Sequence, residues 1–169
     1  SLADRRDPRQ LLHARGAGVT FTFGVDVSTK RIAIACYGDG VADVGSVDIK
    51  QDVRGAARLV RVRRAALKAA RRHVHYPSLI VVEDANVGAA ANKPLIQAVG
   101  VVLEAMAYAY TCPVAESPIG TWKKAALGRG NAVKADVWEG ALAHGFAPEN
   151  QDEADAACVA VAAFRGLVS

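Results

Sequence analysis

The chain has 169 residues, the length of a single domain. Hydrophobic residues make up 51% and charged residues 22%, a globular composition that argues against a disordered chain, and no apolar stretch is long enough to predict a membrane span. The formal net charge of +4 permits a polyanionic partner without requiring one. Three cysteines without CxxC spacing and no visible secretory signal favour a reducing, cytoplasmic setting.

The first half of the chain predicts a polar tail followed by strands. Residues 1–18 are expected to form the N-terminal tail, and the domain is predicted over residues 19–169. Alternating apolar residues then predict three strands, at 19–27, 31–37 and 41–49. The Gly38-Asp39-Gly40 turn between the second and third strands indicates an antiparallel meander.

The second half alternates between helical and strand patterns. Helical spacing over 52–74 predicts a helix whose apolar face comprises Val53, Ala56, Ala57, Val60, Leu67, Ala70 and Val74. Short apolar runs predict strands at 79–83 and 113–116. Proline and capping signals predict four more helices, over 92–110, 117–127, 131–144 and from Asn150 onward. The resulting α/β order, β-β-β-α-β-α-β-α-α-α, resembles the ribonuclease H-like fold, a mixed five-stranded sheet with helices on both faces.

Four acidic residues stand at positions that this order brings together. Asp26 ends the first strand, Glu83 ends the central strand, and Asp152 and Asp155 share a face of the last helix. If the first and fourth strands are neighbours, these carboxylates converge. Taken singly, each has a structural explanation. Asp26 could be a turn residue and Glu83 a loop residue, and Asp152 and Asp155 could complement the dipole at the start of the helix.

A convergence of four carboxylates indicates a cation site. Such groups repel one another strongly unless cations lie between them, and an all-oxygen set suits Mg²⁺ or Mn²⁺. Two such ions stabilise the attacking and leaving oxygens of phosphodiester hydrolysis. Glu153 is a weaker ligand candidate, because Asn150 and Glu153 have the spacing of a capping box.

Several short motifs, in this order and spacing, resemble the RuvC family of Holliday-junction resolvases over residues 19–167. The matching segments are Gly24-Val25-Asp26, Val81-Val82-Glu83-Asp84, Gln97-Ala98-Val99-Gly100 and Asp152-Glu153-Ala154-Asp155-Ala156-Ala157. Lys123 and Lys134 match two family lysines, eleven residues apart around Gly128-Arg129-Gly130.

The resemblance implies a metal-dependent endonuclease of the crossover-junction type. It implies two Mg²⁺ (or Mn²⁺) ions per active site, with Asp26 bridging both. Asp26, Glu83, Asp152 and Asp155 would be the catalytic metal ligands, and Lys123 and Lys134 would be catalytic lysines that neutralise phosphates. The family further implies symmetric nicks by a homodimer, and a bacterial or phage-infected host cell.

Basic residues around the glycine loop are the candidate DNA contacts. These are Lys123, Lys124, Arg129 and Lys134, with a solvated surface as the alternative. Asn86 stands where the family usually has an aromatic residue that helps to open the junction, so we expect broad activity on four-way and three-way junctions. Eight basic residues from Arg54 to Arg72 form either a solvated helix face or a contact to a junction arm.

The helix predicted over 92–110 is apolar nearly all round, and the resemblance implies that the homodimer forms through it. Two other functions stay open from sequence. One is a different ribonuclease H-like nuclease that cuts flaps or RNA–DNA hybrids. The other is a sugar-kinase or actin-like nucleotide-binding domain, which the turn from Asp26 to Lys30 faintly resembles but which needs two such domains.

Overall fold

A five-stranded mixed sheet forms the centre of the protein. The computed structural model describes residues 20–85 and 92–166, so the predicted tail at 1–18 lies outside the described residues. The strands are β1 (Thr22–Val27), β2 (Arg31–Gly38), β3 (Val41–Asp48), β4 (Leu79–Glu83) and β5 (Val114–Ser117), in the order β3-β2-β1-β4-β5. The first three strands are antiparallel, and β4 runs parallel to both β1 and β5. The predicted meander and the predicted pairing of the first and fourth strands are therefore confirmed.

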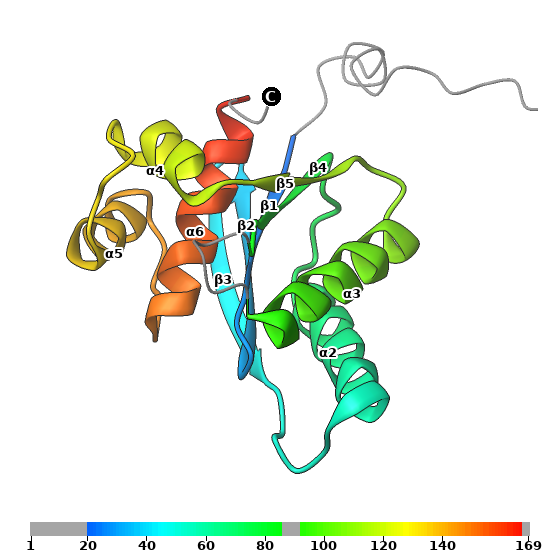
Figure 1. Ribbon diagram of the computed structural model, residues 1–169. Helices are drawn as coiled ribbons and strands as arrows, with labels where there is room; N and C mark the ends of the chain where they lie inside the picture. The colour runs from blue at the N-terminus through cyan, green and yellow to red at the C-terminus, as the bar shows by residue number, and fades with distance from the viewer. Residues whose placement is uncertain (1–19, 86–91, 167–169) are drawn as a thin grey trace, which may run out of the picture.

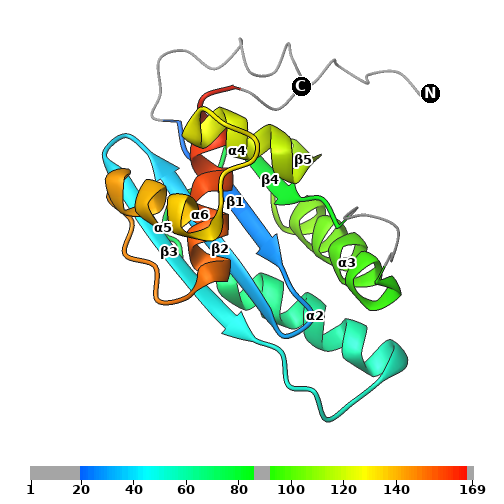
Figure 2. The same ribbon diagram turned by 60° about the vertical axis from the view of Figure 1, so that its left-hand side comes forward.

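Helices cover both faces of this sheet, as Figure 1 and Figure 2 show. One face carries α2 (Gly55–Ala70) and α3 (Lys93–Ala109), and the other carries α4 (Ile119–Leu127), α5 (Lys134–Ala143) and α6 (Gln151–Phe164). The element order and the α/β class agree with the sequence prediction. None of the helices in the described part of the chain has the length and apolar character needed to cross a membrane.

The contact of α6 with the sheet is unusually close. Ala156, Ala157 and Ala160 are fully buried on this helix, and Thr22 Oγ1 donates a 2.8 Å hydrogen bond to the Ala160 carbonyl oxygen. A Cβ atom on Gly24 would lie only 2.2 Å from the Ala156 carbonyl oxygen and from the Ala160 nitrogen. The backbones of β1 and α6 therefore touch, which holds the start of α6 against the end of β1.

The buried face of α2 differs from the prediction. Val60 is half-exposed and Val74, beyond the end of the helix, is almost fully exposed. The residues that α2 buries are Val62, Ala65, Ala66, Ala69 and Ala70. Two residues of the predicted face do pack inward, because Ala70 is buried and Leu67 lies against the core. Ala56 and Ala57, in the first turn of the helix, are exposed, so the prediction is wrong mainly at the helix start.

Two predicted helix starts also move. Ser117 ends β5 instead of capping α4, which begins at Ile119, and the buried Ser117 hydroxyl has no hydrogen-bond partner within the described residues. The next helix, α5, begins at Lys134, three residues after Asn131. Asp136 stabilises this start by accepting a 2.8 Å hydrogen bond from the Val133 backbone nitrogen.

The close contact between β1 and α6 predicts a large effect of Gly24→Ala. The added methyl group has no space without separating the two backbones, so we expect a loss of about 3 kcal/mol or more of unfolding free energy. The matched control is Gly120→Ala in α4, where an added Cβ meets nothing within 4 Å. Urea unfolding of both variants tests this, and equal stabilities would contradict the contact.

Candidate active site

Asp26 and Glu83 lie next to each other at one end of the sheet. Val25 pairs with Val82 in the parallel β1–β4 register, and each acid is the next residue on its strand. Side chains alternate between the faces of a strand. Gly24 touches α6 and Val81 belongs to the apolar cluster around α6, so Asp26 and Glu83 face the same helix.

The first turns of α6 bring the other two predicted carboxylates to this point. Asn150 caps the helix by accepting a 3.1 Å hydrogen bond from the Glu153 backbone nitrogen. Ser28, just beyond β1, donates from Oγ to Asp152 Oδ2 at 3.3 Å. Gln151 Nε2 donates to Asp155 Oδ1 at 3.1 Å. The structure thus brings Asp152 and Asp155 to the end of β1.

Burial and mutual repulsion disturb the titration of this acidic cluster, which comprises Asp26, Glu83, Asp152 and Asp155. Burial raises the pKa of Asp26 well above its ordinary value, and the charges of Glu83, Asp155 and Asp152 raise it further. Burial, with the charge of Asp155, raises the pKa of Glu83 from 4.5 to about 7. Burial also raises the pKa of Asp155. A shared electrostatic field of this kind is typical of functional sites.

Glu153 has a structural role that separates it from the acidic cluster. Its carboxylate accepts a 2.6 Å hydrogen bond from Ser46 Oγ and a 2.8 Å bond from the Glu149 backbone nitrogen. The return bond of the expected capping box therefore goes to Glu149, one residue before the cap. These bonds satisfy the buried carboxylate, which agrees with its lower rank as a ligand candidate.

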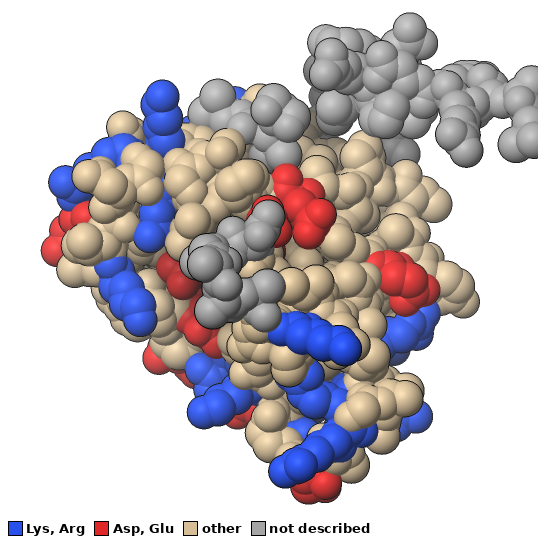
Figure 3. Space-filling model, viewed as in Figure 1, with Lys and Arg blue, Asp and Glu red and all other residues tan. Residues whose placement is uncertain are grey.

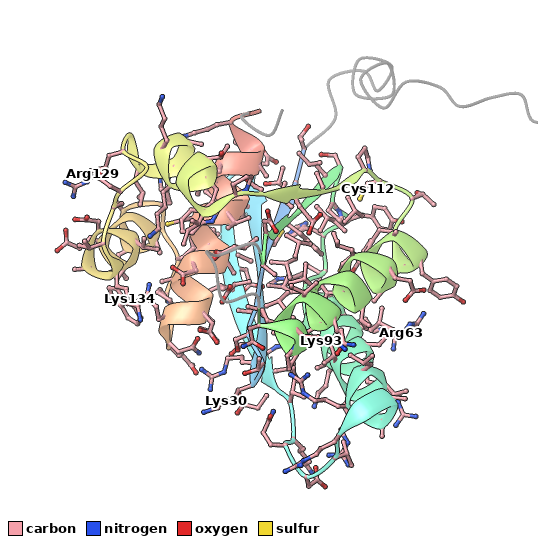
Figure 4. The ribbon with its side chains drawn as sticks, in the orientation of Figure 1. Lys30, Arg63, Lys93, Cys112, Arg129 and Lys134 are labelled. Carbon is pink, nitrogen blue, oxygen red and sulfur yellow. The ribbon has the colours of Figure 1, made fainter. Side chains whose placement is uncertain are left out.

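Two of the four predicted basic residues act electrostatically on the acidic cluster. Lys123 lowers the pKa of Glu83 and of Asp155, and Lys134 lowers that of Asp155. The Lys123 Nζ donates to the Ala132 carbonyl oxygen at 2.8 Å, which fixes the lysine to the loop between α4 and α5. Figure 4 shows Lys134 and Arg129 on the α5 side of the molecule.

Two of the remaining predicted DNA contacts, Lys124 and Arg129, are not part of this cluster. Arg129 pairs with Asp136 at 2.5 Å, and Lys124 is exposed in the last turn of α4. Asn86 lies outside the described residues. Three residues that sequence reasoning missed do contact the cluster: Ser28, Gln151 and Trp122. Only Gln151 carries a sequence signal, because it precedes Asp155 by one helical turn.

The oxygen ligands of the acidic cluster suit divalent cations, but the side chains are not positioned closely enough to bind an ion as they stand. Within the described residues, no three Asp, Glu, His or Cys side chains are grouped closely enough to hold an ion. Glu83 Oε2 is buried and has no hydrogen-bond partner among the described residues. The Trp122 indole nitrogen lies beside this carboxylate and lowers its pKa, but it also lacks a partner of ordinary geometry. A cation would satisfy the orphaned oxygen and relieve the repulsion.

The fold is that of known junction resolvases. RuvC from Thermus thermophilus is similar with a TM-score of 0.67 and 22% identity, over 89% of this chain and 99% of that one. The same protein in complex with a Holliday junction substrate gives a TM-score of 0.71 and 21% identity, over 89% and 98%. The yeast mitochondrial Holliday junction resolvase Ydc2 gives 0.55 and 12%, over 99% and 88%.

The sequence alone gives no such match, because no protein-family model and no curated protein matches the chain. At identities of 12 to 22%, the structural similarity establishes the fold. The predicted ribonuclease H-like architecture and the resemblance to RuvC are therefore confirmed at the level of the fold.

The raised pKa of Glu83 predicts that the cation-free protein loses stability as the pH rises. Its folded pKa is about 7 against 4.5 when unfolded, so the folded state binds more protons across this window. The unfolding free energy should then fall between about pH 5 and 8, by on the order of 3 kcal/mol from Glu83 alone. Asp26→Asn should reduce this fall and stabilise the protein at about pH 8, because it removes one repelling charge.

Urea unfolding in a chelating buffer across this pH range measures the effect. The control is Glu139→Gln on α5, an exposed acid outside the cluster, which should leave the pH dependence of the wild type unchanged. A wild-type stability that rises with pH would contradict the shared field of the acidic cluster.

Proposed function

We propose that this protein is a structure-selective endodeoxyribonuclease that resolves Holliday junctions and other branched DNA. The observation that carries this proposal is the acidic cluster, gathered from β1, β4 and α6 at one end of a RuvC-like sheet. Two of the proteins with a similar fold are RuvC and a Holliday junction resolvase.

Asp26, Glu83, Asp152 and Asp155 are the proposed ligands of two divalent cations, Mg²⁺ or Mn²⁺. Cations bound by such carboxylates supply a hydroxide nucleophile from water and stabilise the leaving oxygen of a phosphodiester. Asp26 would be the ligand shared by the two cations, because the charges of all three other acids raise its pKa. Ser28 and Gln151 orient Asp152 and Asp155 through hydrogen bonds.

The proposed role of Lys123 and Lys134 is to neutralise the phosphate that enters beside the cluster. Both lysines already favour the ionised forms of neighbouring acids. The bond from Lys123 to the Ala132 carbonyl keeps this ammonium group at the site before any DNA binds. Preorganised charge of this kind stabilises a transition state without reorganisation during the reaction.

The proposed active form is a homodimer that uses α3, since a junction needs two nicks related by two-fold symmetry. Val102 and Met106 face the protein's own core and are fully buried, so they are not interface candidates. Ile96 is 47% exposed and Tyr108 is 78% exposed. These two residues are the candidates for contact with a partner.

The acidic cluster predicts that Asp26→Asn abolishes cleavage while junction binding survives. The change removes a proposed cation ligand and leaves the basic surface intact, so we expect at least about a 1000-fold loss of rate. Asp155→Asn should be similarly inactive, whereas Glu153→Gln should retain cleavage and instead lower stability. Single-turnover cleavage of a four-way junction with and without Mg²⁺, beside gel-shift binding, measures both properties.

The choice of substrate is tested with the same enzyme on a panel of four-way junctions, three-way junctions, flaps and RNA–DNA hybrids. Preferential cleavage of flaps or hybrids would favour a different ribonuclease H-like nuclease. Cleavage of a junction by Asp26→Asn at the wild-type rate would remove the cluster from the mechanism.

The dimer predicts that Ile96→Asp yields monomers that nick a junction without making paired cuts. A buried carboxylate at the interface would have no partner, so association should weaken by 100-fold or more, about 3 kcal/mol. Light scattering at micromolar concentration measures the mass. Leu142→Asp is the control, because Leu142 is equally exposed, at 51%, but lies on α5 across the sheet. A monomeric wild type would refute the dimer.

A further inference from the structure

A second polar pocket lies at the same end of the sheet as the acidic cluster, on the opposite face. It has a volume of about 500 Å³ and is formed by the turn after β1, the start of α2 and the start of α3. Its polar lining includes Thr29, Gln51, Arg54, Arg58, Asn92 and Gln97. None of the described residues that line it is acidic.

No acid among the described residues neutralises the positive charge in this pocket. Arg58 is half-buried, and its guanidinium donates to two backbone carbonyls, those of Thr29 at 3.2 Å and Pro94 at 3.5 Å. Arg54 makes no hydrogen bond or ion pair with any described residue. The nearby carboxylate of Asp52 forms an ion pair with Arg61. Within the described part of the chain, two guanidinium groups therefore face the pocket without a carboxylate partner.

The surroundings extend this positive surface. Lys30 follows Thr29, and Lys93 lies between two lining residues at the start of α3; Figure 4 labels both. In Figure 3, Lys and Arg gather over the lower part of the molecule, around α2 and the start of α3. Neither α2 nor α3 has an acidic residue in its first turn, so both helix starts add to the positive potential.

The turn after β1 joins the pocket to the acidic cluster. Ser28 donates its hydroxyl hydrogen to Asp152 on one side of this turn. Thr29, the next residue, lines the pocket on the other side, and its carbonyl oxygen accepts from Arg58 and from Gln51 Nε2 at 3.0 Å. The turn thus lies between the acidic cluster and the pocket that Arg54 and Arg58 line.

We infer that this pocket binds a backbone phosphate of the DNA on which the acidic cluster acts, as a contact separate from the cutting site. Guanidinium groups suit phosphate because their planar donors pair with two oxygens at once. Such contacts position nucleic acid and carry no sequence information. The inference rests on the proposed function for the identity of the DNA, but its test does not require cleavage.

The test measures binding of a fluorescent four-way junction to the full chain in a chelating buffer, where cleavage is stopped, over a series of salt concentrations. Arg54→Ala should raise the Kd about 5- to 10-fold at about 0.1 M salt and reduce the salt slope by about 1. Arg58→Ala should raise the Kd and reduce the salt slope by similar amounts. Urea unfolding of this variant checks that loss of the Arg58 bond to Thr29 has not destabilised the fold. Arg64→Ala is the matched control, an exposed arginine of α2 outside the pocket, and should change the Kd less than about 2-fold.

The outcomes separate this inference from the proposed function. Equal weakening by Arg54→Ala and Arg64→Ala would overturn the pocket, because the effect would then be general charge. Arg54-dependent binding of polyglutamate that is tighter than binding of DNA would also overturn it, since the pocket would then suit an acidic protein. Arg54-dependent DNA binding without cleavage of any branched substrate would uphold the pocket and contradict the nuclease.

Discussion

The contact between the backbones of β1 and α6 is the constraint on which the candidate site depends. Gly24 has no side chain, and the facing positions Ala156 and Ala160 are small, so the strand and helix meet without intervening side chains. A close approach of this kind leaves little room for one element to shift against the other. Because Asp26 follows Gly24 by two residues and Asp155 precedes Ala156, the same contact defines how these carboxylates face each other.

This geometry is unfavourable for the isolated fold. The cluster buries carboxylates of like charge and raises the pKa of Asp26, Glu83 and Asp155. It also leaves Glu83 Oε2 without a hydrogen-bond partner in the described part of the chain. A sequence selected for stability alone would replace at least one of these acids. Unfavourable repulsion of this sort is expected at a site where a ligand relieves it. Repulsion among carboxylate oxygens is relieved by a hard cation.

Sequence reasoning reached most of the architecture because the relevant signals are local. Alternation in β1 to β3, the apolar run of β4 and the turn at Gly38-Asp39-Gly40 predict the strands directly. The parallel pairing of β1 with β4 then followed from the element order. The acidic cluster could be predicted for the same reason, since each acid lies near the end of an element whose place the topology defines.

The failures occur where tertiary packing decides between similar local patterns. In α2, Val62 and four alanines are buried while Val60 is half-exposed, a choice that the apolar spacing alone does not decide. Ser117 has the sequence of a helix cap, but pairing with Glu83 across β4 and β5 extends the strand through it. Ser28 and Trp122 carry no local signal, because their contacts with the cluster come from residues distant in sequence.

The three acids at the start of α6 lie on two sides of the helix and have different surroundings. Glu153 is buried, and its two hydrogen bonds connect the helix start to β3 through Ser46 and to the preceding loop through Glu149. Asp152 and Asp155 lie on the side that faces β1 and are left with single polar contacts from Ser28 and Gln151. A carboxylate whose acceptor sites are filled is a poor ligand, whereas one with free lone pairs is available to a cation. The hydrogen bonds of Glu153 therefore hold the start of α6 in place, with Asp152 and Asp155 on the side that faces β1.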